Sequence, residues 1–330
     1  MQNNSIKEFH LFAGIGGGIY GGQMLRHKCI GGCEIDSYAQ KVLKQRQKDK
    51  WIEPFDIYDD ITKLNGKDFQ NTFDVLCGGF PCQAFSHAAH GKNIKEKNLW
   101  PYMLQFIKDS DAPVVFGENV TLTAIETAKQ DLENLGYEIQ LCRLSCADLN
   151  ADHKRPRFWL LAVKNKDIFY KIANQIKELP IFKACFWETN PNDIQYPAEI
   201  KVKKHQIRGV GNAQAPVVAA TAFRILVNRF IDNKEYSVSL DDEELNKVFK
   251  KSQTWIQKNY PEDDGFVHTP TTMGNYHCKS MMKHQCCRKY VKIFKEPNVL
   301  DAEYLMGFPI GASSTEPQSL ENYNKWLKQI

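Results

Sequence analysis

The sequence contains no uninterrupted run of about 18 apolar residues, the length that a bilayer-spanning helix needs, so it predicts no membrane span. The opening segment, Met1–Glu8, is mostly polar and lacks the apolar region of a secretory signal. Internal repeats and low-complexity tracts are also missing. These absences argue against a membrane, secreted or repeat protein, and we expect a cytoplasmic one.

An excess of charge of one sign is missing as well. The chain has 43 Lys and Arg against 39 Asp and Glu, a formal charge of +4, so any contact with nucleic acid depends on where the cations lie. The 10 cysteines are scattered along 330 residues rather than spaced as a small disulfide framework. We therefore expect reduced thiols in a chain long enough for one large and one small domain.

Strand and helix patterns alternate over residues 1–164, which predicts an α/β fold with a doubly wound, mostly parallel sheet and helices on both faces. The patterns predict strands at 9–13, 29–33, 73–77, 113–116, 137–144 and 158–163, and helices at 99–108, 124–135 and 217–231. Residues 164–205 show no strong period.

A glycine-rich turn, Gly14–Gly18, stands between the first predicted strand and the helix after it. Such a turn lets the backbone approach a ligand at the carboxyl edge of the sheet, although the spacing is not that of a dinucleotide fingerprint. Glu34 ends the second predicted strand, where doubly wound sheets hold ribose hydroxyls. The alternatives are a turn packed for its own sake and a solvated acid.

Cys82 follows a strand in the segment Gly79-Phe80-Pro81-Cys82-Gln83, where Pro81 fixes the turn before the sulfur. A cysteine attacks only as thiolate, so this interpretation requires a lowered pKa or a proton acceptor. The alternative is a buried structural cysteine, which is how Cys77, Cys142 and Cys146 are interpreted.

Glu118 closes the apolar strand Val114-Val115-Phe116, and burial there can raise its pKa so that it shares a proton with a ring nitrogen. Asn119 beside it can orient either the acid or the loop of Cys82. A thiolate adding to carbon 6 of a pyrimidine, with an acid on the ring nitrogen, turns cytosine into a carbon nucleophile. The alternative for Glu118 is an acid that complements the dipole of the next helix.

Cations occur at two further places. Arg155 and Arg157 precede an apolar strand and offer forked donors to a phosphate or a carbonyl oxygen, unless they form only a solvated basic turn. Residues 275–295 contain no acid and predict a nucleic-acid contact through Lys279, Lys283, Arg288, Lys289, Lys292 and Lys295. The same stretch holds His277, Cys278, His284, Cys286 and Cys287, but without a clean CxxC pair, so we predict no metal site.

Together these segments closely resemble the DNA (cytosine-5)-methyltransferase family, whose members use S-adenosyl-L-methionine, and they do so in family order over most of the catalytic domain. The resemblance implies cofactor contacts through its first three motifs, the nucleophile loop and the late Gly-Asn motif, at Phe12, Ala13, Gly14, Ile15, Gly16, Gly17, Glu34, Ile35, Asp60, Ile61, Gly79, Pro81 and Asn212. It also implies catalytic roles for Cys82, Glu118, Arg155 and Arg157, and substrate contacts at Gln83 and Asn119.

The sequence departs from the family pattern at four points. His10 stands where the first motif usually has Asp, and His153 replaces the usual Gln. The segment Met306-Gly307-Phe308-Pro309 follows Gly211-Asn212 instead of preceding it, as in compact phage- or prophage-type enzymes. No long recognition domain separates Arg157 from Gly211, so we expect recognition within 233–298.

The resemblance implies four segments: a catalytic cofactor-binding domain at 1–164, a connecting or recognition segment at 165–205, a return to the catalytic domain at 206–232, and a small, irregular recognition region at 233–330. It implies a monomer that flips a cytosine out of double-stranded DNA and methylates carbon 5, and it allows a cognate restriction endonuclease. A tRNA cytosine-5 methyltransferase, a catalytically weak DNA-binding relative and, more remotely, a dinucleotide-dependent oxidoreductase remain alternatives.

Overall fold

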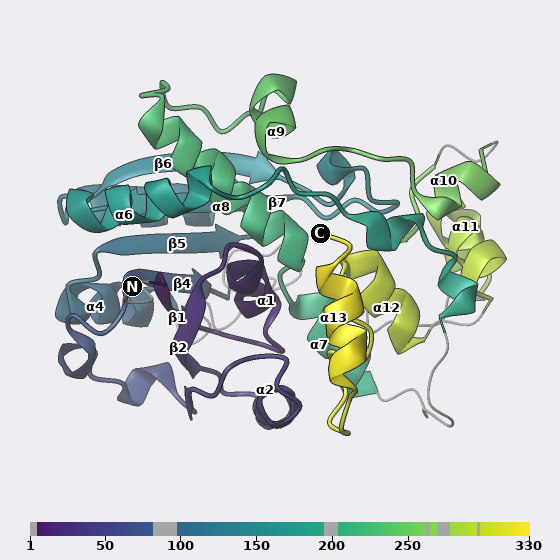
Figure 1. Cartoon of the computed structure of the whole chain (residues 1–330), viewed down its shortest axis with the longest axis horizontal. Coiled ribbons are helices and arrows are strands. Elements are labelled where there is room, and N and C mark those ends of the chain that lie inside the picture. The colour runs from purple at the N-terminus through teal and green to yellow at the C-terminus, as the bar shows by residue number, and fades with distance from the viewer. Residues whose placement is uncertain (1–4, 82–97, 195–203, 262–264, 269–277, 296–297) are drawn as a thin grey trace.

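The computed structural model describes residues 5–81, 98–194, 204–261, 265–268, 278–295 and 298–330 (Figure 1). A seven-stranded sheet has the order β3-β2-β1-β4-β5-β7-β6. Its strands are β1 (Lys7–Leu11), β2 (Lys28–Cys33), β3 (Asp56–Tyr58), β4 (Val75–Gly79), β5 (Val114–Asn119), β6 (Glu138–Leu144) and β7 (Arg157–Val163). Of these seven strands only β7 runs opposite to the other six, so the predicted mostly parallel sheet is confirmed.

Helices cover both faces because the buried strands are apolar on each side. Along β4, Val75 and Cys77 face one core and Leu76 faces the other. The first core packs against α1 (Gly17–Met24), α2 (Ser37–Lys48), α6 (Lys166–Lys177) and α8 (Pro216–Ile231). The second packs against α4 (Trp100–Ser110) and α5 (Leu122–Glu133). The predicted doubly wound arrangement is therefore confirmed.

Strand β3 and helix α6 are two of the elements that the sequence patterns did not predict. The three-residue β3 is too short to show an alternation of its own. Helix α6 lies in the stretch that showed no strong period, where Asn165 caps its first turn and Phe169, Ile172, Ala173 and Ile176 are buried.

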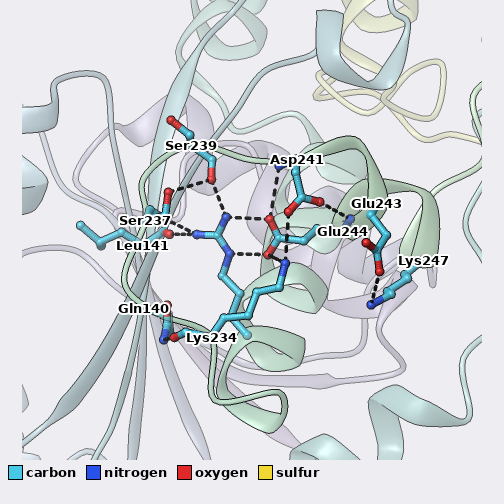
Figure 2. Close-up of polar contacts among 10 residues, drawn as sticks. Gln140, Leu141, Lys234, Ser237, Ser239, Asp241, Glu243, Glu244 and Lys247 are labelled. Carbon is cyan, nitrogen blue, oxygen red and sulfur yellow. Dashed lines mark hydrogen bonds and ion pairs between the residues drawn. The ribbon is translucent and has the colours of Figure 1, made fainter.

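Helix α8 is buried along nearly its whole length. An 18-residue window within His205–Ile231 has the mean hydropathy, 1.3, of a membrane span, but 83% of that window is buried inside the protein, as in a core helix. Near its end Arg229 forms a buried pair with Glu244, at 2.7 Å and 3.0 Å, and donates to the carbonyls of Leu141, Ser237 and Ser239 (Figure 2). One guanidinium thus joins α8, β6 and the segment that leads into α9 (Asp242–Val248).

The remaining helices are α7 (Lys204–Asn212), α10 (Trp255–Asn259), α11 (Gln285–Phe294), α12 (Val299–Met306) and α13 (Leu320–Leu327). Figure 1 shows α10 and α11 at one end of the molecule, α4 and α6 at the other, and α12 and α13 between them beside α7. The recognition region expected at 233–330 is not wholly separate, because α13 packs on the first domain. Trp326 and Tyr323 meet Tyr20 of α1, and Arg46 of α2 donates to the carbonyls of Gly311 and Glu316 at 2.6 Å and 2.5 Å. The four-part division of the chain stays a prediction.

Candidate active site

The candidate site lies where the strand order reverses, at the carboxyl ends of β1, β2, β4 and β5. Beside the neighbouring strands β1 and β4 the connections turn in opposite directions, which leaves a crevice in a doubly wound sheet. A cavity of about 730 Å³ occupies this place. Strand ends from β1, β2, β4 and β5 contribute to its wall, together with α7 and the turn between α7 and α8.

The glycine-rich turn after β1 forms one side of the cavity. Gly14 and Gly16 have φ values of 55° and 96°, which glycine adopts without the cost of a Cβ. The Glu34 carboxylate accepts the backbone N–H of Gly14 at 2.6 Å and that of Asp36 at 2.8 Å. Burial raises the pKa of Glu34 although these hydrogen bonds oppose the shift. The acid therefore fixes the turn while it lines the cavity.

Most residues expected to contact the cofactor line this cavity: Phe12, Ala13, Gly14, Ile15, Gly17, Glu34, Ile35, Gly79, Pro81 and Asn212. Gly16, Asp60 and Ile61 are not part of its lining. Gly16 instead provides the turn before α1, and Asp60 caps the short helix Ile61–Lys63 by accepting from Thr62. The roles of all these residues remain predictions.

Glu118, at the end of β5, is held by two side chains. Its Oε1 lies 3.0 Å from Nε of Arg157, an ion pair that lacks the alignment of a hydrogen bond, and its Oε2 accepts from Nε2 of Gln214 at 3.4 Å. Glu118 is 9% exposed. Gly79 lies close beside this pair, since a Cβ there would come within 2.8 Å of Oε2 and 3.1 Å of Nε2. The carboxylate is thus fixed against β4.

Asn119 follows Glu118 and holds the loop after β4. Its Nδ2 donates to the Phe80 carbonyl at 2.9 Å, and its Oδ1 accepts from the N–H of Thr121. Phe80 and Pro81 line the cavity. Cys82 and Gln83, which come next in the chain, lie outside the described residues.

Arg155 and Arg157 take different positions. Arg155 is buried, has a φ of 145° that non-glycine residues rarely adopt, and donates from Nη2 to the carbonyls of Gly211 and Ala213, both at 2.8 Å. Burial, and then the nearby Arg157, lower its pKa to about 10. Arg155 therefore supports the α7–α8 junction, while Arg157 is the guanidinium that reaches Glu118.

His153 of the same segment is fully buried, and neither of its ring nitrogens has a hydrogen-bond partner among the described residues. Burial, and then the two arginines, lower its pKa to about 3, so the ring is neutral. Nothing in the structure gives it a role beyond packing.

The predicted basic surface is only partly present. Lys279, Lys283 and Arg288 are exposed, and Arg288 donates to the carbonyls of Met282 and Lys283. Lys289 corrects the expectation, because it is 4% exposed and its Nζ donates to the Gly265 carbonyl at 2.6 Å. It lies on the packed side of α11. Among the described residues, Cys278, His284, Cys286 and Cys287 do not gather with the spacing of metal ligands, and His277 lies outside them.

Several cavity residues were not expected from the sequence. His10, named only as a departure from the motif, lines the cavity from β1, and Gln214 lines it from the turn before α8. Tyr38, His205 and Arg208 add polar groups from α2 and α7. A signal for Gln214 was its position directly after Gly211-Asn212-Ala213, but its contact with Glu118 depends on the tertiary fold.

The cavity can hold an elongated polar ligand. An acid stands at its β2 end, a glycine-lined wall lies beside β1, and a carboxylate–guanidinium pair stands at its β5 end. The described cysteines are all free, as expected of reduced thiols.

Comparison of the sequence with known proteins identifies the family to which the chain belongs. The model of the family described as C-5 cytosine-specific DNA methylase matches residues 6–309. Type II methyltransferase M.MspI of Moraxella sp is 28% identical over 179 residues, which is 51% of this chain and 41% of that protein. Type II methyltransferase M.HhaI of Haemophilus parahaemolyticus is 29% identical over 173 residues, 50% of this chain and 51% of that protein.

A third relative, Type II methyltransferase M.Eco47II of Escherichia coli, is 31% identical over 175 residues, 50% of this chain and 41% of that protein. The chain thus spans about half the length of the curated relatives it matches. The family model covers most of the sequence, and its match confirms the resemblance carried by the motifs. The chain belongs to the C-5 cytosine-specific DNA methylase family.

Proposed function

We propose that this protein transfers a methyl group from S-adenosyl-L-methionine to carbon 5 of cytosine in double-stranded DNA. The observation that carries the proposal is the Glu118 carboxylate, held between Arg157 and Gln214 beside Gly79, from which the chain leads to Cys82. The acid and Phe80-Pro81, which lead to Cys82, lie at the carboxyl ends of neighbouring strands, β5 and β4. In a cytosine bound there, Glu118 would contact the ring nitrogen and Cys82 would contact carbon 6.

In this proposal Cys82 forms a bond from its sulfur to carbon 6 while Glu118, in its acid form, donates a hydrogen bond to nitrogen 3 and stabilises the charge that develops on the ring. Arg157 has further N–H groups for the base carbonyl, and Asn119 keeps the Phe80 carbonyl in place at the start of the cysteine loop. Carbon 5 takes the methyl group and then loses its proton to water. The sulfur–carbon bond breaks, and Cys82 is restored.

The bound methyl donor supplies an electrophilic methyl on a sulfonium. On the protein side, Glu34 would accept from the ribose hydroxyls, and Phe12 and Ile35 would flank the adenine. Because carbon 6 of a stacked cytosine is out of reach, the base must be flipped from the duplex at a cost of a few kcal/mol. The exposed cations Lys279, Lys283 and Arg288 would meet the DNA backbone.

Several further points are part of the same proposal. We expect the protein to act as a monomer in the cytoplasm, with or without a cognate restriction endonuclease. A tRNA methyltransferase and a catalytically weak DNA-binding relative are the competing functions, and each gives a different result in the test that follows.

The first prediction tests the nucleophile. Duplex DNA carrying 5-fluorocytosine at the target should trap a covalent adduct with the wild-type protein and the methyl donor, because carbon 5 then has no proton to lose. Cys82→Ser should give no adduct, whereas Cys185→Ser, a matched change away from the cavity, should still give one. Denaturing gels and mass spectrometry of the modified peptide measure the adduct.

Target sites are first located by methylating genomic DNA and mapping 5-methylcytosine. Methylation of tRNA in place of DNA would support the RNA alternative. Binding of DNA with no methylation by the wild-type protein would support the regulatory one, and an adduct with Cys82→Ser would remove the sulfur from the mechanism.

A further inference from the structure

His10 lies in the wall of the cavity with a carboxylate behind it. The ring is 4% exposed, and its Nε2 lies 2.9 Å from Oε2 of Glu8, two residues earlier on the same side of β1. The other oxygen of Glu8 lies 2.6 Å from Nδ1 of His27. Burial opposes ionisation of Glu8, but the attraction and hydrogen bonds of the two histidines outweigh it and lower its pKa to about 2.

The ionised Glu8 determines which nitrogen of His10 carries the proton. A carboxylate only accepts hydrogen bonds, so the ring nitrogen that faces it must be the donor. In the neutral ring, Nδ1 then keeps a free lone pair. Nδ1 has no hydrogen-bond partner among the described residues, while the ring lines the cavity. The thiol of Cys77, on β4, is also near Glu8 and His10, but burial raises its pKa well above the ordinary value and keeps it uncharged.

A second acceptor points to the same place. Because Nε2 of Gln214 donates to Glu118, the amide oxygen of Gln214 is directed elsewhere. A Cβ built on Gly18 would lie 2.6 Å from that oxygen and 3.3 Å from Nδ1 of His10. The missing side chain of Gly18 therefore leaves a small space that both acceptors border.

The strand order indicates which part of the methyl donor reaches this space. Its sulfonium carries three arms: the methyl group, the adenosine and an aminobutyrate chain. With the ribose at Glu34 on β2 and the methyl group directed to β4 and β5, the third arm lies over β1, the strand between them. That arm ends in an ammonium and a carboxylate, and two acceptors suit the ammonium.

We propose that Nδ1 of His10 and Oε1 of Gln214 accept hydrogen bonds from the ammonium of S-adenosylmethionine, and that Glu8 fixes the ring tautomer that makes this possible. The inference rests on the proposed function. His10 stands where the family motif usually has an acid. With Nδ1 unprotonated, its ring can accept a hydrogen bond from a cation, as an acid can. Glu8 is a positioning residue, since it acts through His10.

The second prediction compares two ligands by calorimetry. S-adenosylhomocysteine has the aminobutyrate chain, and 5′-methylthioadenosine lacks it. His10→Gln removes the acceptor at Nδ1, and it should weaken S-adenosylhomocysteine binding about 10- to 100-fold, as expected for one hydrogen bond to a charged group. Its affinity for methylthioadenosine should not change. His10→Asn, whose side-chain oxygen can take the place of Nδ1, should retain most of the difference between the ligands.

Nitrogen NMR of histidine-labelled wild-type protein provides a readout that does not depend on a variant. Nδ1 of His10 should resonate as an unprotonated nitrogen and shift with S-adenosylhomocysteine but not with methylthioadenosine. Equal losses for both ligands in His10→Gln, or a protonated Nδ1 in the free protein, would overturn the inference. If the wild-type protein binds neither ligand, the proposed function itself fails, which separates the two ideas.

Discussion

At the scale of single residues, the site depends on a glycine, because only a residue without a side chain fits at position 79. Gly79 ends β4 next to the carboxylate of Glu118 and the amide of Gln214. A methyl group at Gly79 would overlap Oε2 at 2.8 Å, and real Cβ atoms essentially never approach that closely. The acid and the amide could not both keep their positions.

The third prediction is that Gly79→Ala lowers methyl transfer at least about 100-fold, the cost expected when a group that acts in the transition state is displaced. The thermal midpoint should fall only slightly, since side chains rather than backbone must move. Gly117→Ala in the adjacent strand is the matched control, because its Cβ would meet only Leu160, at 3.8 Å. Turnover equal to that of the control would show that the Glu118 position is not critical.

Residues of the site could be predicted from the sequence where they stand at strand ends. Glu34 and Glu118 follow apolar strands, so their approach to one sheet edge follows from the parallel order. The contact of Gln214 with Glu118 could not be predicted from the sequence, because it joins two segments that only the fold brings together. The buried position of Lys289 was in principle visible, since Cys287, Tyr290, Ile293 and Phe294 around it form the apolar side of a helix.

At the scale of elements, the first turn of α12 contains a buried acid, Asp301. Asn298 caps the helix, and Oδ2 of Asp301 accepts from the Asn298 N–H at 3.1 Å and from the Tyr290 hydroxyl at 3.2 Å. Burial raises the pKa of Asp301 from 3.8 to about 7 despite these bonds. The folded state therefore favours the protonated acid, and α11 is joined to α12 through it.

The fourth prediction concerns the pH dependence of stability. Because the pKa is higher in the folded state, the contribution of Asp301 is fully present below pH 3.8 and is lost as the pH rises through 7. Asp301→Asn keeps the shape without the ionisation. The free energy of unfolding in urea should decline less from pH 4 to pH 8 in this variant than in the wild type.

The exposed Asp59 offers a matched control for that measurement, because Asp59→Asn makes the same substitution at the surface. Parallel profiles for the wild type and Asp301→Asn would contradict the assignment.

Elements were predictable where the apolar period was long. The central strands and α8 appear close to their expected bounds, because buried β-branched and aromatic runs permit few other structures. Helix α6 was missed although Phe169, Ile172, Ala173 and Ile176 have helical spacing, since the polar and irregular residues after it obscure the period.

At the scale of the whole molecule, the cations are divided between the two ends. Lys279 and Lys283 are exposed near α11, and Lys108 and Lys177 are exposed on α4 and α6 at the other end (Figure 1). The net charge of +4 is too small to attract DNA to every face. Position rather than total charge should therefore determine the contact.

The fifth prediction is that the double change Lys279→Gln and Lys283→Gln weakens binding to duplex DNA and reduces the slope of log affinity against log salt by about one unit per lost phosphate contact. Lys108→Gln with Lys177→Gln removes the same charge from the other end and should leave the slope unchanged. Fluorescence anisotropy over a salt series measures both. Equal effects of the two pairs would place the DNA elsewhere.

The packing of α13 on the first domain has a consequence for synthesis. The rings of Tyr20 and Trp51 are covered by Phe308, Tyr323 and Trp326, and Arg46 finds its carbonyl partners at Gly311 and Glu316. A nascent chain emerging from the ribosome holds α1 and α2 with these apolar rings and a buried cation uncovered until nearly three hundred more residues have been translated. The part of the fold that is synthesised first is thus completed last.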